Sequence, residues 1–498
     1  MYTFLLSIVA LLLGYFLYSR LVERVVAPDA SKPTPAVTHN DGMDYIPMPT
    51  WKVFMIQFLN IAGTGPIFGA IMGAKFGPSC YLWIVLGCIF AGAVHDYLSG
   101  MLSMRHDGAG LPVLIGEYLG RRTKAVMLVF TVLMLTLVGA VFVYSPAVIL
   151  GGMTEGVTGN ITSSTMFWVV VVFIYYVIAT FLPIDKIIGK IYPVFAFALI
   201  FMAVALLVCL LVKWPSLPEI WQGIGNRAPS VGVKGQSIFP CLFITVACGA
   251  ISGFHATQSP LMARCLKNEK LGRPVFYGSM ITEGLVALVW ATVASYFFFD
   301  GGAAEVGGDM TTAAPAVVTL VSKSWLGVFG GVLAILGVVA APITSGDTSL
   351  RSARLIVADA FKLDQKPWRN RIVISLPIFI AAALLIWFNI SDSQGFNVIW
   401  RYFGWANQTL AVFTLWALTS WLSRERKGVW YLLTMLPACF MTAVTLTFIL
   451  TDKTGFRLPA SLIPYLGTGL FLVSMLLFYV IRSRNRKRRQ AKKTSEEA

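Results

Sequence analysis

Residues 60–73 read NIAGTGPIFGAIMG and lie inside an apolar segment at 51–72. That segment has the length of a membrane helix. Its middle nevertheless holds Gly63, Gly65 and Pro66, which break helices. In hydrocarbon, backbone groups freed by a break are costly unless other groups satisfy them. The sequence therefore predicts an unwound site that lines a cavity or binds a ligand.

The composition predicts an all-α, polytopic membrane protein. Of 498 residues, 57% are hydrophobic and 12% are charged, whereas soluble domains carry about 25% charged residues. The net charge of +16 gathers in short loops and in the last part of the chain. This positive-inside pattern argues against nucleic-acid binding. The seven cysteines form no CxxC pair and are read as small buried hydrophobes.

Apolar runs of about 20 residues predict thirteen membrane spans. They cover residues 2–19, 51–72, 78–101, 123–150, 165–182, 187–212, 237–262, 274–299, 318–345, 371–389, 395–420, 429–450 and 460–481. With the C-terminus placed in the cytoplasm, the inside segments collect 31 of the 39 Lys and Arg residues. The first span is then a retained helix with its N-terminus outside, not a signal peptide.

A second interrupted span, 237–262, holds Gly249, Gly253 and Pro260. Paired broken helices point to a transporter with inverted repeats. Each broken span begins a unit of five spans. Because five is an odd number, the second unit enters the membrane from the opposite face. We expect these units: an N-terminal helix and linker at 1–50, repeat 1 at 51–212, an extracytoplasmic loop at 213–236, repeat 2 at 237–420, two further helices at 421–481 and a basic cytoplasmic tail at 482–498.

The first break offers two opposite helix ends to ligands. Free N–H groups where the outer half-helix starts, near Gly65, suit a carboxylate. The carbonyls that end the inner half-helix, near Asn60, suit a cation. The substrate-binding candidates are Asn60, Gly63, Thr64 and Gly65. Alternatively, Gly65, Gly69 and Gly73 form a small-residue row for helix packing, and both interpretations can hold together.

The second break adds the substrate-binding candidates Gly249, Ser252, Gly253 and His255. His255 can bind substrate or titrate, but a lone buried histidine is also often structural.

The stretch WRYFGWANQTLAV at 400–412 contributes Arg401, Asn407 and Gln408. Arg401 is placed to clamp a carboxylate or to pair with Asp392 near the outer surface. The amides Asn407 and Gln408 fall near the middle of their span.

Ionisable residues within spans are candidates for ion coupling. His95 and Asp96 lie late in the span 78–101, with a buried structural pair as the alternative. Glu283 lies about 14 Å deep by helical rise, where desolvation favours its protonated form. Lys190 is a candidate to stand in place of a sodium ion, or else snorkels to the interface.

The stretch APITSGDTSLRSAR at 341–354 is predicted to close the ninth span. Hydroxyls of Thr344, Ser345 and Thr348 are candidates for Na⁺ coordination with carbonyls of the first break, or for capping the helix end. Asp347 is a coupling candidate and is spaced to pair with Arg351.

Seven stretches in order resemble the carbon starvation protein A (CstA) family. They are NDGMDYIPMPTW, NIAGTGPIFGA, LWIVLGCIFAGAVHDY, GFHATQSP, YGSMITEGLVALVWA, APITSGDTSLRSARL and WRYFGWANQTLA, spread over residues 40–412. The resemblance implies the leucine-transporter-like (LeuT-like) five-plus-five fold and nutrient uptake through a bacterial inner membrane during starvation. The family is assigned peptide transport, and some members resemble proton-coupled pyruvate transporters. This chain is shorter than the larger members.

Together these features favour a secondary active importer of a small carboxylate-bearing nutrient, a peptide or pyruvate. No cofactor is expected, and the coupling ion is H⁺ or, alternatively, Na⁺. A membrane starvation sensor is a second hypothesis, although no long cytoplasmic output domain is evident. An intramembrane enzyme is a third, without a nucleophile–base pair or an HExxH, GxSxG or P-loop motif to support it. The oligomeric state is left open.

Overall fold

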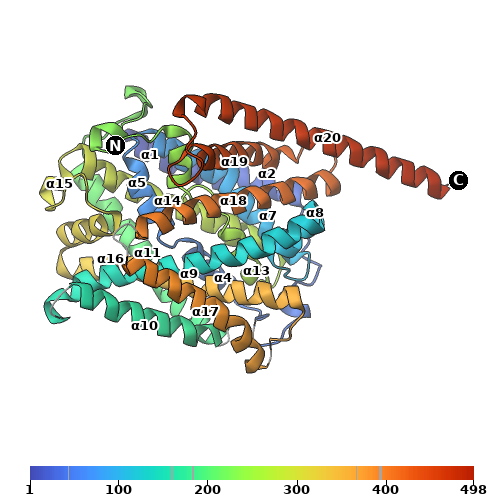
Figure 1. Ribbon diagram of the computed structural model, residues 1–498, viewed down its shortest axis with the longest axis horizontal. Coiled ribbons are helices and arrows are strands. Elements are labelled where there is room, and N and C mark those ends of the chain that lie inside the picture. Colours follow the sequence, from blue (N-terminus) through green and yellow to red (C-terminus); the bar gives the residue numbers. More distant parts are fainter. Residues whose placement is uncertain (43, 159–160, 182–183, 366, 392–394, 498) are drawn as a thin grey trace.

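The computed structural model describes the chain apart from residues 43, 159–160, 182–183, 366, 392–394 and 498. Side chains at 152–153, 155–158, 161–164, 181, 184–191, 329–330, 333–334, 395–397 and 486–497 also lie outside the description. The described residues form an α-helical bundle whose long helices run roughly along the long axis of the molecule (Figure 1).

The first half of the chain carries both short and long helices. They are α1 (Tyr2–Leu13), η1 (Gly14–Tyr18), α2 (Ser19–Val26), α3 (Pro35–Thr38), α4 (Thr50–Ile61), η2 (Gly65–Gly69), α5 (Ala70–Ala74), α6 (Ser79–Gly87), η3 (Cys88–Gly92), α7 (Ala93–Met104), α8 (Leu111–Leu119), α9 (Arg121–Thr158), α10 (Ile161–Phe181) and α11 (Ile184–Lys213).

The second half begins after two short turns, η4 (Ile220–Gln222) and η5 (Ala228–Val231). It contains η6 (Ile238–Leu242), α12 (Phe243–Thr245), α13 (His255–Ala263), η7 (Glu269–Leu271), η8 (Arg273–Tyr277), α14 (Gly278–Phe299), α15 (Gly302–Glu305), α16 (Ala314–Phe361), α17 (Trp368–Ser391), α18 (Gly395–Glu425), α19 (Leu432–Thr451), η9 (Ala460–Leu462) and α20 (Ile463–Glu497).

Nine of the predicted spans meet both the length and the hydropathy expected of a membrane helix within the described residues. Eight are continuous helices, and the ninth is the bent pair formed by α4 with η2 and α5, which turns by 53°. The other predicted spans correspond to α10, to the broken segment from η6 to α13, to α16 and to α18. The total of thirteen and the proposed unit boundaries stay predictions.

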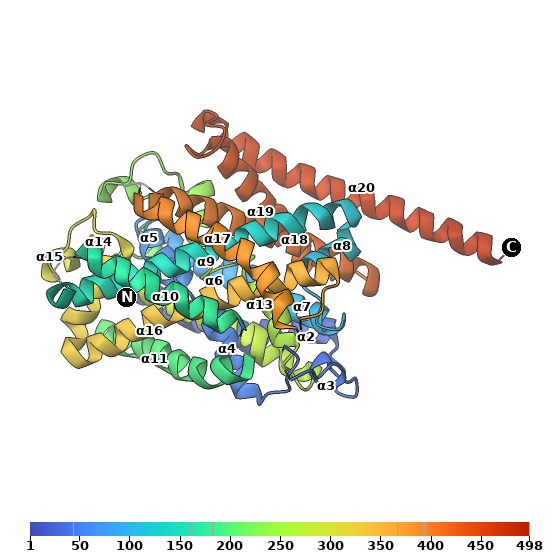
Figure 2. The same ribbon diagram turned by 60° about the horizontal axis from the view of Figure 1, so that its bottom comes forward.

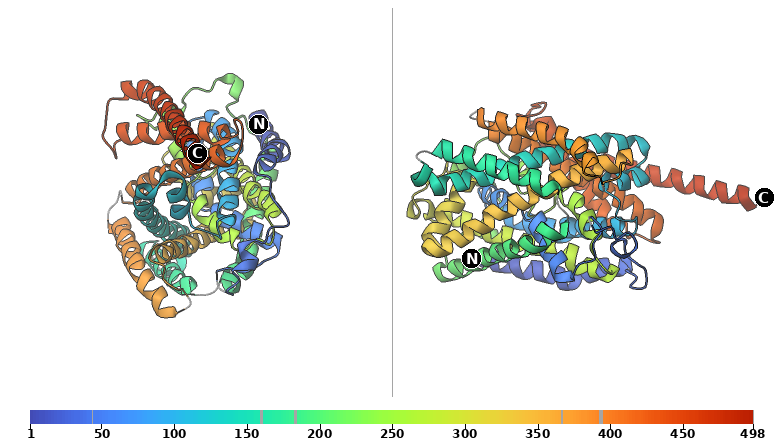
Figure 3. Two further views of the ribbon diagram at one scale, coloured as in Figure 1. Left: turned by 90° about the vertical axis from the view of Figure 1, so that its right-hand side faces the viewer. Right: turned by 90° about the horizontal axis from the view of Figure 1, so that it is seen from below.

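The centre of the bundle is formed by helices that are far apart in sequence. α16 packs against α9 and α11, α14 packs against α4 and α5, and α13 packs against α7 (Figure 2). By contrast, α20 lies at the periphery, with 6% of its apolar window buried (Figure 3). The buried helices α7, α13, α14 and α16 therefore surround the two breaks.

Basic loops gather at one end of the bundle, which we call the basic face, made by residues 20–50, 105–121, 264–273 and 422–431. Arg105 joins two of these segments, because its Nη2 donates to the Val26 carbonyl at 3.2 Å and to Glu269 Oε2 at 2.9 Å. At the opposite end, the backbone N–H of Thr3 donates to Glu219 at 2.7 Å. The start of α1 and the loop 213–236 therefore share one end, as the predicted alternation requires.

Candidate functional site

The two breaks contact each other directly. The first covers residues 62–64 between α4 and η2, and the second covers 246–254 between α12 and α13. A Cβ added to Gly65 would lie 2.3 Å from Cys248 Sγ, and one added to Gly249 would lie 3.7 Å from Pro66 Cα. The half-helix that begins at Gly65 is thus seated on the second break, and no side chain fits between them.

The glycine row after the first break also packs against the second. A Cβ on Gly69 would lie 2.8 Å from the Thr245 carbonyl oxygen, and one on Gly73 would lie 2.1 Å from Val246 Cγ2. Unwinding and close packing therefore occur in the same element, as both sequence interpretations allowed. The glycines of this row pack so closely against the second break that a larger side chain would collide with it.

Asn407 of α18 satisfies the backbone of the second break. Its Oδ1 accepts hydrogen bonds from Ser252 Oγ at 3.0 Å and from the Phe254 N–H at 2.8 Å. Its carbonyl accepts the Gly253 N–H at 3.2 Å. A Cβ on Gly253 would lie 2.3 Å from that same carbonyl oxygen. Only glycine fits this close approach of two backbones.

Gln408 extends the same support by one residue. Its Nε2 donates to the Ile251 carbonyl at 3.0 Å. Buried backbone groups in hydrocarbon need such partners, so the two neighbouring amides of α18 hold the second break in its unwound shape.

At the first break, α16 contacts the end of α4. Ser345 Oγ donates to the Asn60 carbonyl at 2.8 Å, and Thr348 Oγ1 lies 3.4 Å from Asn60 Oδ1. Thr344 is also fully buried, and its hydroxyl donates to carbonyls of its own helix. The predicted hydroxyl cluster thus lies beside the carbonyls that were expected to bind a cation.

The expected helix end at residue 345 is wrong. α16 continues without interruption through this point to Phe361, so Thr344, Ser345 and Thr348 do not cap a terminus. Because these residues are polar, a hydropathy profile predicts that they lie at the membrane surface. In the structure α4 and α9 bury this stretch.

Several fully buried polar atoms at the first break have no hydrogen-bond partner among the described residues. They are Nε2 and Oε1 of Gln57, Nδ2 of Asn60 and Oγ1 of Thr64. Buried polar groups are usually hydrogen-bonded, so each exception calls for an explanation, such as a bound ligand, ion or water. Gln57 lies on α4 one turn before Asn60 and was not among the residues predicted from the sequence.

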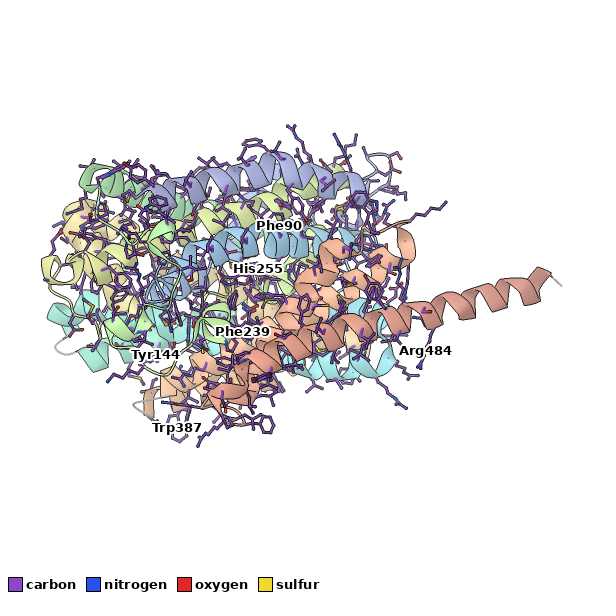
Figure 4. All side chains as sticks on the ribbon, turned by 90° about the horizontal axis from the view of Figure 1, so that it is seen from above. Phe90, Tyr144, Phe239, His255, Trp387 and Arg484 are labelled. Atoms are coloured by element: carbon purple, nitrogen blue, oxygen red, sulfur yellow. The ribbon has the colours of Figure 1, made fainter. Side chains whose placement is uncertain are left out.

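Asp96 joins two histidines inside the bundle. Its Oδ1 lies 2.8 Å from His95 Nδ1, and its Oδ2 lies 2.9 Å from His255 Nδ1. All three side chains are fully buried, and Figure 4 shows His255 in the interior, away from Trp387 and Arg484 at the edges. An ionised Asp96 can only accept, so in that state both imidazoles must carry a proton on Nδ1.

Glu283 extends this chain onto a third helix. Its Oε2 lies 3.5 Å from His255 Nε2, and neither atom has a hydrogen-bond partner among the described residues. When His255 is neutral with its proton on Nδ1, its Nε2 is an acceptor. A proton held on the Glu283 carboxyl then faces a base at the far end of the same imidazole. We call His95, Asp96, His255 and Glu283 the buried acid–histidine chain.

Asp347 accepts a hydrogen bond from a residue that the sequence did not suggest. Tyr192 donates to its Oδ2 at 2.8 Å, whereas Arg351 donates from Nη2 to the Ala179 carbonyl at 2.6 Å. A second Arg351 nitrogen, Nη1, lies 3.9 Å from Asp44 Oδ1 in the linker before α4. The sequence had given no reason to select Tyr192, because tyrosines are common in apolar helices.

Two other candidates, Arg401 and Lys190, do not join the residues at the breaks. Arg401 lies apart from them, and the side chain of Lys190 is outside the described residues. Arg401 is 40% exposed, and its Nη1 lies 3.9 Å from Asp452 Oδ1, so it lies at the edge of the bundle and not among the buried groups. Asp392, its alternative partner, falls outside the described residues. Lys190 belongs to α11, but its side chain is also outside the description.

Cys248 is a site residue that sequence reasoning missed. Its Sγ contacts Ser252 Oγ at 3.6 Å and Asn407 Nδ2 at 3.7 Å, and it faces Gly65 as described above. Reading every cysteine as a small buried hydrophobe concealed it. Its position directly before Gly249 was the available signal.

The linker before α4 covers the site at the basic face. Asp44 lies 3.9 Å from Arg351 and 4.0 Å from Arg354 of α16, and the ring of Tyr45 lies 4.8 Å below the Arg264 guanidinium. A cavity of about 210 Å³ opens beside this linker. These contacts tie the linker to α13 and α16.

A family model described as "Carbon starvation protein CstA" matches residues 1–156, 143–325 and 317–448. The chain belongs to the CstA family. The resemblance inferred from the seven stretches is thereby confirmed. The chain is a multi-pass membrane transporter and not an enzyme.

Curated relatives agree with the CstA assignment. An "Uncharacterized membrane protein" of Haemophilus influenzae is 44% identical over 59% of this chain and 91% of its own length. "Peptide transporter CstA" of Campylobacter jejuni is 27% identical over 87% of this chain and 78% of its own length. The Escherichia coli protein of the same name is 25% identical over 89% and 79%.

Solved structures confirm the LeuT-like fold expected of the CstA family. A manganese transporter of Eremococcus coleocola matches with a TM-score of 0.56 at 13% identity, covering 90% of this chain and 99% of the other. The nucleobase-cation-symport-1 transporter Mhp1 matches with a TM-score of 0.55 at 15% identity, covering 87% and 92%. At these identities the likeness establishes the fold alone.

Proposed function

We propose that the chain is a proton-coupled importer of small carboxylate-bearing nutrients, peptides or pyruvate, that serves carbon-starved bacteria. The basic face is the cytoplasmic one, so the N-terminus lies outside and the C-terminus inside. The distribution of Lys and Arg supports this orientation, and the names of the curated relatives support peptides as the substrate class.

The observation that carries proton coupling is the buried acid–histidine chain. Asp96 on α7, His255 on α13 and Glu283 on α14 bring three titratable side chains from three helices into one line. His255 begins the half-helix that follows the second break. Protonation of Glu283 or of His255 therefore changes the contact between α13 and α14 next to the proposed substrate site.

Carboxylate binding is supported by the polarity of the first break. The half-helix that starts at Gly65 directs its N-terminal end toward the break, and the N-terminal end of a helix stabilises an anion. Unsatisfied polar atoms of Gln57, Asn60 and Thr64 lie alongside. Separation of the two breaks opens this region to a substrate carboxylate.

The test is uptake by proteoliposomes that contain the purified protein. Labelled pyruvate is compared with labelled di- and tripeptides under separate H⁺ and Na⁺ gradients. Accumulation driven by an inward H⁺ gradient without Na⁺ supports the proposal. Uptake that runs equally well without a pH gradient but needs Na⁺ overturns proton coupling.

Sodium coupling is the second candidate, and one observation favours it. Ser345 Oγ lies 2.8 Å from the Asn60 carbonyl oxygen and 3.3 Å from the Leu59 carbonyl oxygen. Hydroxyls and carbonyls are suitable oxygen ligands for Na⁺. In this conformation, however, the Ser345 hydroxyl itself satisfies the carbonyls. Uptake by Ser345→Ala that keeps the normal Na⁺ dependence would exclude this site.

A further inference from the structure

A cavity at the basic face is lined by cationic and apolar side chains. Its volume is about 430 Å³. It is lined by Leu21, Arg24, Val25, Arg426, Lys427 and Trp430. Three of these six side chains are cationic and none is acidic. The cavity lies between the end of the first membrane helix and the loop that connects α18 to α19, far in sequence from either break.

The cationic side chains of this cavity are available to a ligand. Arg24 and Lys427 are both exposed. Arg426 is half-buried and donates one hydrogen bond from Nη2 to the Val26 carbonyl, which holds the loop against α2; its buried Nε has no partner among the described residues. Glu23, the acidic neighbour of Arg24, pairs with Arg273 at 3.0 Å. It therefore leaves the positive charge of the cavity uncompensated.

The position of the cavity fits the surface of the bilayer. Two membrane spans meet the cavity: the helix Tyr2–Val26 ends beside it, and the helix Leu432–Thr451 begins beside it. Leu21 is 37% exposed and Trp430 is 39% exposed, and tryptophan at such a place is typical of the membrane–water interface. Arg482, near the end of a third span, stacks on Tyr431 at 4.0 Å and adds positive charge beside Trp430.

We propose that this cavity binds the headgroup of an anionic phospholipid from the adjacent leaflet. The phosphate lies between Arg24, Arg426 and Lys427, and the acyl chains lie along Leu21 and Trp430. Arginine and lysine bind phosphate through charge-assisted hydrogen bonds, and basic sites between membrane helices favour anionic lipids of the cytoplasmic leaflet. A bound lipid links α2 to the α18–α19 loop without touching the transport site.

The test uses the full-length protein in detergent, with native mass spectrometry to count bound lipid. Phosphatidylglycerol and phosphatidylcholine are titrated in parallel against the wild type, Arg24→Gln/Lys427→Gln and a control, Arg121→Gln/Arg122→Gln. The control removes the same charge from exposed residues of the same face. We expect phosphatidylglycerol to bind about thirtyfold more weakly to the first variant, with the control unchanged.

Two results would overturn the proposal. Equal loss in both double variants would mean that general positive charge, and not this cavity, attracts the lipid. Displacement of phosphatidylglycerol by millimolar inorganic phosphate, or equal binding of phosphatidylcholine, would mean that the cavity does not select an anionic lipid. Arg24→Lys provides a check on folding, because it keeps the charge and should keep most of the binding.

Discussion

Gly65 and Cys248 lie at contact distance although they belong to the two halves of the chain. A Cβ on Gly65 would come within 2.4 Å of both Cβ and Sγ of Cys248. This one contact joins the start of the half-helix in the first break to the middle of the second break. It makes the two breaks a single packed unit.

Replacing Gly65 with leucine should abolish transport while the protein stays in the membrane, because the side chain separates the packed breaks. Labelled uptake and membrane abundance measure the two effects. Gly469→Leu is the control, since a Cβ at Gly469 meets no atom within 4 Å. Near-normal uptake by Gly65→Leu would refute the role of the break.

The contact itself can be tested by a compensating pair. Gly65→Ala should impair uptake, and Gly65→Ala/Cys248→Gly should restore it, because the second change removes the atoms that collide. The nearest remaining Cys248 atom, Cα, lies 3.8 Å from the new Cβ, which is an ordinary contact. Failure of the double variant to recover would show that Gly65 is needed for more than space.

Replacing Glu283 with glutamine should flatten the pH dependence of uptake between about pH 6 and about pH 8, because an amide cannot release a proton toward His255. Uptake is measured at fixed membrane potential over that range. Glu117→Gln is the matched control, since Glu117 is half exposed at the basic face. A profile that is unchanged in Glu283→Gln would leave Glu283 with a structural role only.

Replacing Asp96 with asparagine should uncouple transport from the proton gradient. The amide offers one acceptor oxygen in place of two, so it can hold both His95 and His255 only if one of them gives up its Nδ1 proton. We expect concentrative uptake to be lost while exchange of labelled for unlabelled substrate continues. Ser99→Ala on the same helix is the control, because among the described residues Ser99 Oγ donates only to the Asp96 backbone carbonyl, at 3.1 Å. Full accumulation by Asp96→Asn would contradict the coupling role.

Replacing Asn407 with alanine should destabilise the protein by about 1–3 kcal/mol, because the buried Phe254 N–H loses its acceptor. Thermal unfolding of the purified protein in detergent measures the change. Asn389→Ala is a useful comparison, since Asn389 is also buried but its amide has no partner among the described residues. Equal shifts for the two variants would mean that Asn407 does not support the break.

Glu269 should contribute stability that depends on pH. Burial alone raises the pKa of its carboxyl, but hydrogen bonds from Arg105 and from the Asp29 N–H outweigh it and lower the pKa below the ordinary 4.5. A lowered pKa in the folded state means that the stabilisation is present above about pH 4.5 and is lost as the pH falls further. The melting temperature of Glu269→Gln should therefore lie below that of the wild type at neutral pH, and the two should converge in acid. A gap that persists in acid would point to packing instead.

The broken helices could be predicted from sequence because glycine and proline act through the local backbone. The same holds for Asp96 and Glu283, since any ionisable residue within an apolar span is conspicuous. Their assembly with His255 could not be predicted in this way. It depends on how α7, α13 and α14 pack, and Asp96 and His255 are separated by 159 residues along the chain.

The errors have equally physical causes. The helix end placed at residue 345 followed from hydropathy, which treats Ser345 and Thr348 as solvent-facing although α4 covers them. Arg401 attracted attention as a charge within a span, yet its partner Asp452 comes from a loop beyond the next helix. Gln57 carries no charge and interrupts no pattern, so only the packing around the first break reveals it, whereas Cys248 could have been noticed from its position directly before Gly249.

The packed breaks also set a limit on what a binding measurement reports. A substrate that binds between Gly65 and Cys248 can enter only those molecules in which the breaks have parted. The apparent dissociation constant is then the intrinsic constant divided by the fraction of parted molecules. Any two substrates that bind only the parted molecules share that factor. The ratio of their apparent dissociation constants therefore reflects only their own contacts with the protein. The absolute affinity of either one reflects, in addition, how seldom the protein opens.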